Sequence, residues 1–85
     1  MNSIWGQDAE KIDSLKKILN LHSENKLKIE TLLALSYELE GSELKQALQY
    51  SKQAYSLAKE EMDKKQMISS LMSESFIYYS LSDLK

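Results

Sequence analysis

The sequence predicts an all-α fold built from antiparallel helical hairpins, with about four helices. Apolar residues recur at spacings of three and four along most of the 85 residues, which is the period of a helix that buries one face. β-Branched residues are few, and no stretch alternates apolar and polar residues as a half-buried strand does. Helices therefore account for the whole pattern.

The first helix is expected over about residues 8–22, with Asp8 as its cap, inside a leading segment at 8–24 that follows a disordered tail at 1–7. Its apolar side carries Ile12, Leu15, Ile18, Leu19 and His22. The polar stretch "HSENK" predicts a short turn, with Ser23 or Asn25 capping the next helix.

The second helix is expected over about residues 26–40 and is apolar on two sides. One side carries Ile29, Leu32, Leu33, Ser36 and Tyr37; the other carries Leu35 and Leu39. Such a helix must be covered on both sides. Gly41 is expected to end it, because glycine adopts the left-handed conformation at little cost, and Ser42 is expected to cap the following helix.

The third helix, about residues 43–62, has a stripe of small residues that permits close approach by a neighbour: Ala47, Ser51, Ala54 and Ala58. The fourth, about residues 67–82, carries Ile68, Leu71, Met72, Ser75, Phe76 and Tyr79. Asp63 and Gln66 resemble a capping box, which predicts a break near Asp63. An unbroken helix is the alternative, because Glu60–Lys64 and Glu61–Lys65 are favourable i, i+4 pairs.

Composition excludes several classes of partner. The chain has a net charge of −2, and all 11 basic residues are lysines interleaved with acids, so no basic stripe for nucleic acid forms. No run reaches the roughly 18 apolar residues of a membrane span, and no membrane contact is expected. The compartment stays open: it is cytoplasmic or, if residues 1–6 are the remnant of a signal peptide, periplasmic.

No catalytic or cofactor-binding constellation is visible. The chain has no cysteine, and its single histidine, His22, has no carboxylate three or four residues later, so no metal site is expected. There is no glycine-rich phosphate loop and no nucleophile turn. An enzyme is therefore not expected. The acidic residues Glu38, Glu40 and Glu43 are interpreted as a solvated turn rather than a cation or basic-peptide site.

Two segments are similar to each other. "LALSYELEGSEL" aligns with "ESFIYYSLSDL", placing Tyr37 on Tyr78, 41 residues later. The first copy resembles the tetratricopeptide repeat, a helix–turn–helix unit of about 34 residues, at Leu33, Ala34, Tyr37, Gly41, Ala47 and Ala54. The resemblance implies a right-handed solenoid fragment, with a hairpin at 25–62 and the first helix of an incomplete second repeat at 63–85. The longer period and the missing terminal proline depart from the family pattern.

The layout also resembles the N-terminal sensor regions of bacterial signalling proteins of the histidine kinase or regulator type, through "KIDSLKKILN", "ALQYSKQAYSLAKE" and "DKKQMISSL". This resemblance implies a non-catalytic protein–protein interaction module, the N-terminal fragment of a signalling or regulatory protein. The alternative is a structural helical bundle or coiled-coil dimerisation segment without a ligand.

In the tetratricopeptide family the first helix of each pair lines a concave groove. The resemblance therefore implies a site for a protein or peptide partner at Lys28, Leu35, Glu38, Leu39, Met72, Phe76 and Tyr79. For Leu39 and Phe76, packing on a neighbouring helix is an equal alternative. An incomplete repeat would also leave the stripe of helix 67–82 exposed, so self-association is expected.

Overall fold

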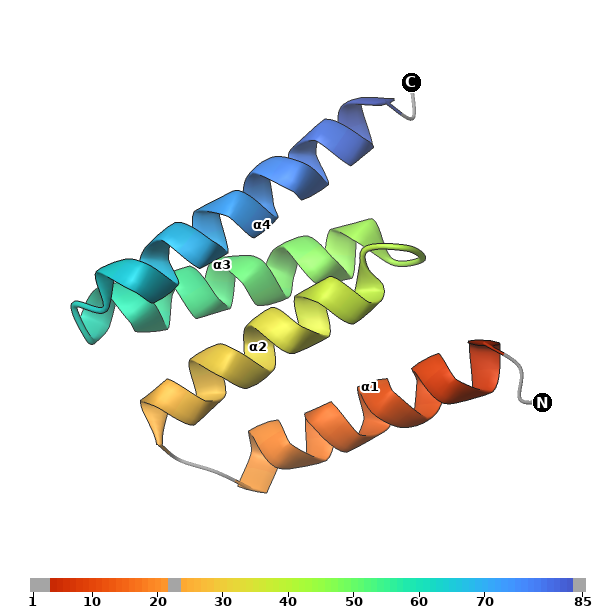
Figure 1. Ribbon diagram of the computed structural model, residues 1–85, viewed down its shortest axis with the longest axis horizontal. Coiled ribbons are helices and arrows are strands. Elements are labelled where there is room, and N and C mark those ends of the chain that lie inside the picture. The colour runs from red at the N-terminus through yellow and green to blue at the C-terminus, as the bar shows by residue number, and fades with distance from the viewer. Residues whose placement is uncertain (1–3, 22–23, 84–85) are drawn as a thin grey trace.

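Four helices follow one another across the molecule in chain order, and each packs antiparallel on the next (Figure 1). The computed structural model describes residues 4–21 and 24–83. The helices are α1 (Ile4–Leu21), α2 (Asn25–Leu39), α3 (Leu44–Glu60) and α4 (Lys64–Asp83). α2 and α4 also contact each other beside α3. The principal extents of 40 × 34 × 16 Å describe a thin slab. The all-α prediction is confirmed.

The small residues of α3 form the centre of the core. Ala47, Ser51, Ala54 and Ala58 are all completely buried. Ser36 of α2 donates a hydrogen bond to the backbone carbonyl of Ala47 at 2.9 Å, so the two helices approach closely at this point. The prediction of close packing along this stripe is confirmed.

Larger apolar side chains complete the core at its two ends. One cluster contains Ile29, Leu32, Ala54 and Ala58, and the other contains Leu39, Ala47 and Ile77. α1 adds Leu19 to the first cluster and Ile12 to the second. Within the described residues, Ile77 is the one large apolar side chain of α4 that is fully buried. The two apolar sides expected for α2 are thus both covered, although Tyr37, placed on the first of them, is 71% exposed.

The helix starts differ from the sequence-based expectation. α1 already begins at Ile4, so Asp8 lies inside it, and the N-cap of α2 is Glu24, which makes no side-chain capping bond. Asn25 is the first residue of α2, and its side-chain amide donates to the Glu61 carboxylate at 2.7 Å. That bond joins the start of α2 to the end of α3. The tail residues 1–3, His22 and Ser23 lie outside the described residues.

The turn between α2 and α3 does not use Gly41 as expected. No glycine has a positive φ, and a Cβ built on Gly41 meets no atom within 4 Å. The backbone instead continues in right-handed turns, with the Glu43 N–H bonded to the Leu39 carbonyl at 2.8 Å. Glu43 is the N-cap of α3 and forms no side-chain capping bond, so Ser42 is not the cap. The helix ends at this turn as expected, but the left-handed glycine and the Ser42 cap were wrong.

The turn between α3 and α4 has the left-handed residue instead. Met62 has a φ of 56°, the Asp63 N–H bonds to the Ala58 carbonyl at 2.9 Å and the Met62 N–H bonds to the Lys59 carbonyl at 3.1 Å. These bonds form a Schellman motif with methionine at the position that glycine usually takes. Asp63 Oδ1 then accepts from the Gln66 N–H at 3.1 Å and caps α4. The predicted break is confirmed, and the unbroken helix is wrong.

Exchanging the roles of the two turn residues is expected to stabilise the protein. Met62→Gly should raise the free energy of unfolding by about 0.5–1 kcal/mol, because it removes the side chain that makes a left-handed residue unfavourable. Gly41→Ala should raise it by about 0.4–1 kcal/mol by restricting the unfolded chain. Urea unfolding of the single variants and the double variant checks this, and a destabilised Gly41→Ala would contradict the right-handed turn.

Candidate partner-binding surface

One side of α4 is covered with large apolar side chains that contact solvent. We define the α4 outer face as Ile68, Leu71, Met72, Phe76, Tyr78 and Tyr79. Their exposed fractions range from 46% to 72%. At 100° per residue they fall on the side of the helix opposite Ser70 and Ile77, which are completely buried. α4 therefore packs on the rest of the molecule through Ile77, its inner serines and the partly buried Met67 and Leu81, and presents its other large side chains outward.

The α4 outer face contains no charged side chain. The residues that lie among its six members are Ser75 and Ser82, both exposed. Glu74 is partly buried and lies on the flank of the helix near Ser70, while Lys64 and Lys65 are exposed at the N-terminal end of α4. An apolar surface of this length is uncommon on a small monomer, and such patches are typical of interaction sites.

The residues predicted to bind a partner divide into two groups. Met72, Phe76 and Tyr79 belong to the α4 outer face. The residues predicted on α2 do not reach solvent in the same way: Leu35 and Leu39 are buried and Lys28 is partly buried. The structure therefore does not bring the seven residues together as one open groove.

α1 explains why the α2 side is closed. It packs along α2, and Lys11 Nζ forms an ion pair with the Glu38 carboxylate at 2.9 Å. The Glu38 side chain is only 12% exposed. Leu35 lies one turn before Glu38 on the same side of α2. The surface that the repeat pattern assigns to a partner is therefore occupied by a helix of the same chain.

Sequence reasoning identified half of the α4 outer face as a binding surface. Ile68 and Leu71 were placed in the apolar stripe but not in the site, and Tyr78 was used only to align the two similar segments. A helical projection of residues 68–79 is the signal that groups all six, because it separates them from the serine-rich side. The expected exposure of the stripe on helix 67–82 is confirmed.

Three serine hydroxyls meet where α2, α3 and α4 converge. Ser51 Oγ lies 2.6 Å from Ser36 Oγ and 2.8 Å from Ser73 Oγ, and the Ser36 and Ser73 oxygens are 3.2 Å apart. Because Ser36 donates its proton to the Ala47 carbonyl, its Oγ can act only as an acceptor toward another serine hydroxyl. We call these residues the serine cluster. It joins three helices through hydrogen bonds between their side chains.

The acidic turn is not simply solvated. Glu38 is paired with Lys11, and Glu40 is partly buried beside the serine cluster. Desolvation raises the pKa of Glu40 above its ordinary value of 4.5, and a hydrogen bond with Ser73 lowers it in part. Glu43 is exposed. Two of the three carboxylates therefore serve internal packing, which corrects the interpretation of this run as a solvated turn.

Glu40 is expected to lower stability as the pH rises from 4.5. Its folded-state pKa is above the ordinary value, so the folded state retains the proton to a higher pH than the unfolded chain. The stabilisation from protonated Glu40 is complete below 4.5 and is lost as the pH passes the folded pKa. Glu40→Gln should therefore gain stability relative to the wild type with rising pH, measured by urea unfolding at several pH values. Glu43→Gln, which removes an exposed charge from the same turn, is the control, and equal pH profiles for the two variants would contradict the assignment.

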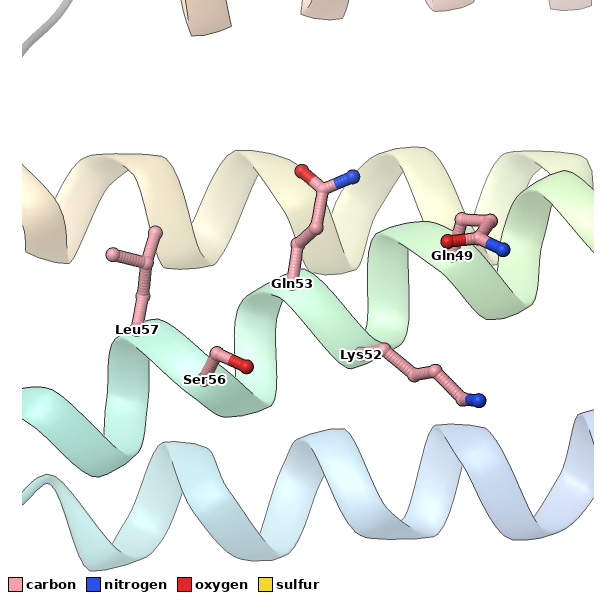
Figure 2. A pocket seen from close by; sticks show the side chains of 5 residues that line it. All are labelled: Gln49, Lys52, Gln53, Ser56 and Leu57. Atoms are coloured by element: carbon pink, nitrogen blue, oxygen red, sulfur yellow. The ribbon is translucent and has the colours of Figure 1, made fainter.

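Two of the hollows on the surface are lined by described residues. The first, of about 350 Å³, is lined entirely by α3, with Gln53 directed toward α2 and Lys52 toward α4 (Figure 2). The second, of about 420 Å³, lies at turn 40–45 beside Leu81. Across residues 4–21 and 24–83, no three acidic or histidine side chains gather as metal ligands. In the same part of the chain, no helix has the length and apolar character needed to cross a bilayer.

Comparison of the chain with protein-family models, with curated proteins and with solved structures finds no match.

Proposed function

We propose that this chain is a non-catalytic protein–protein interaction module whose docking surface is the α4 outer face. The observation that carries the proposal is the exposure of six large apolar side chains on one side of a helix whose opposite side is packed. Leaving such side chains in water is unfavourable. A complex with a partner that covers them is therefore stabilised, because binding removes them from solvent. Tyrosine, phenylalanine and methionine also suit recognition of a protein surface.

The same proposal includes a tetratricopeptide-like architecture of the bacterial signalling type. Support comes from the buried small residues Ala47 and Ala54 at the α2–α3 contact, and from the contact of α2 with α4 across one intervening helix. Each repeat of a solenoid packs on its neighbours in this sequential manner. The exposed Tyr37 and the right-handed turn at Gly41 depart from the roles that the repeat pattern gives them.

In this proposal the docking surface differs from the groove that the repeat pattern implies. α1 occupies the α2 side, through Lys11 and Glu38, so the partner contacts α4 alone. Met72, Phe76 and Tyr79 remain as predicted contact residues, joined by Ile68, Leu71 and Tyr78. A single helical face of this kind is suited to pairing with an amphipathic helix.

Selection from a displayed library of amphipathic helical peptides tests the function. Peptides selected on the wild type should bind at least tenfold more weakly to Met72→Lys, because a charge in the centre of the apolar face must be desolvated on binding. They should bind unchanged to Lys52→Glu, an exposed substitution on α3. Circular dichroism should show equal helicity in all three proteins. Failure to select any peptide that distinguishes Met72→Lys from the control would reject the proposal.

Stability separates a docking surface from a packing surface. Met72 is 68% exposed, so its replacement should change the free energy of unfolding by no more than about 0.5 kcal/mol. A loss of several kcal/mol in the monomer would instead assign the α4 outer face to the structural core.

A further inference from the structure

We infer that the partner of the α4 outer face is the same face of a second copy of the chain, packed antiparallel across a two-fold axis. The inference rests on the proposed function and adds the identity of the occupant and its orientation. It depends on the spacing, size, area and charge of the residues on this face.

The spacing along the α4 outer face is that of a helix-pairing seam. Its central line consists of Ile68, Met72, Ser75, Tyr79 and Ser82, which follow one another at intervals of four, three, four and three residues. Side chains at these intervals interdigitate with those of another helix that crosses at a small angle. Leu71, Phe76 and Tyr78 flank the line and cover its sides.

The sizes of the side chains complement one another when the seam is paired with itself. An axis midway between residues 73 and 74 places Met72 of one copy opposite Ser75 of the other. It also places Ile68 opposite Tyr79. Leu71 and Tyr78 share one flank of the seam, where the two-fold axis brings Leu71 beside Tyr78 of the other copy. Large side chains thus meet small ones at the centre, and apolar pairs flank them. A two-fold interface requires this kind of self-complementarity.

The exposed area is sufficient for a stable dimer. Taking about 200 Å² for each fully exposed large side chain, the six members expose on the order of 700 Å² in one copy. A stable complex buries about 800 Å² per partner, and the largest apolar patch on a typical monomer is about 300–600 Å². The α4 outer face therefore approaches the size of a whole interface without any contribution from other helices.

The charges at the end of α4 select the antiparallel orientation. Lys64 and Lys65 are exposed on this side at the N-terminal end. Antiparallel packing places them beside the C-terminal carbonyls of the partner helix, where a cation is stabilised by the helix dipole. Parallel packing would bring the lysine pairs of both copies together, which is repulsive.

Exchange of α4 between copies would not produce this interface. In an exchanged dimer, α4 of one copy would pack on α3 of the other through Ile77 and the serines, and the α4 outer face would remain in solvent. Substitutions on the outer face therefore distinguish face-to-face packing from helix exchange.

Sedimentation across the micromolar range, with the wild type, Met72→Lys and Lys52→Glu, tests the occupant. The wild type and Lys52→Glu should dimerise, and Met72→Lys should dimerise at least tenfold more weakly while keeping its helicity. Tyr79→Lys is a second variant on the same face and should behave as Met72→Lys does. A wild type that stays monomeric at high micromolar concentration overturns the inference, yet leaves the proposed function to be decided by peptide binding. Equal dimerisation of all variants also overturns it.

Cysteine cross-linking tests the orientation, because the chain has no natural cysteine. Mixing Met72→Cys with Ser75→Cys should give the mixed disulfide in preference to either homodimer. Parallel packing predicts homodimers of Met72→Cys with Met72→Cys, and that result would overturn the antiparallel arrangement.

Discussion

Replacing Ile77 with alanine is expected to lower the free energy of unfolding by about 2–4 kcal/mol. Ile77 is completely buried and packs with Leu39 and Ala47 at one end of the core. Its removal leaves a cavity, because the surrounding helices are held by close contacts between small residues and cannot collapse onto the space. Urea unfolding followed by circular dichroism measures the loss, which is large for a domain of this size.

Phe76→Ala is the matched control for that substitution. It removes a larger side chain from the preceding residue, but Phe76 is 52% exposed on the outer face. In the monomer its replacement should cost less than about 1 kcal/mol. If the two substitutions were equally destabilising, the assignment of the two sides of α4 would be wrong.

Replacing Ser51 with leucine is expected to lower the free energy of unfolding by about 3 kcal/mol or more, which could prevent folding altogether. Ser51 is completely buried, with its hydroxyl in contact with Ser36 and Ser73. Leucine is too large for the close approach of three helices, and it also leaves Ser73 without its nearest partner in the serine cluster. Far-UV circular dichroism and thermal unfolding report the outcome.

Two other substitutions separate the effect of the added volume from the effect of the lost hydroxyl. Ser51→Ala removes the hydroxyl without adding volume and should cost about 1 kcal/mol, the net value of a buried hydrogen bond. Lys52→Leu places the same leucine at the next, exposed position and should change stability by less than about 0.5 kcal/mol. A well-folded Ser51→Leu variant would show that the three helices are less closely packed than their hydrogen bonds indicate.

The all-α fold and the α3 core could be predicted because they depend on local pattern. The small residues Ala47, Ser51, Ala54 and Ala58 are spaced by four, three and four positions, which places them on one side of a helix. The break at Asp63 could also be predicted, because the Asp63 carboxylate caps α4 by accepting a hydrogen bond from the Gln66 N–H, three residues later. Such features require only interactions between residues close in sequence.

The turn at Gly41 could not be predicted in the same way. A glycine after a helix permits a left-handed residue but does not require one, and here the backbone continues into right-handed turns. The left-handed residue is Met62. Here the carbonyls of Ala58 and Lys59 accept hydrogen bonds from the backbone N–H groups of the turn. Which turn adopts the motif depends on how the helices must cross, which is a tertiary property.

The candidate site was only partly predictable for a related reason. Periodicity shows that Leu35 and Leu39 must be covered, but it does not say whether α1 or a separate partner covers them. For α4, the pattern offers two usable sides. The close approach of α3, seen in the contact of Ser51 with Ser73, accepts only the side with small residues, so the larger side chains face outward.

The attachment of α1 has a consequence for how the protein opens. Within residues 4–21 and 24–83, α1 makes its helix–helix contacts with α2, whereas α2, α3 and α4 all contact one another. Partial unfolding can therefore release α1 while the other three helices stay together, and the amide hydrogens of α1 should exchange with solvent well before those of α3. Each such opening breaks the Lys11–Glu38 pair and briefly exposes to water the side of α2 on which α1 packs.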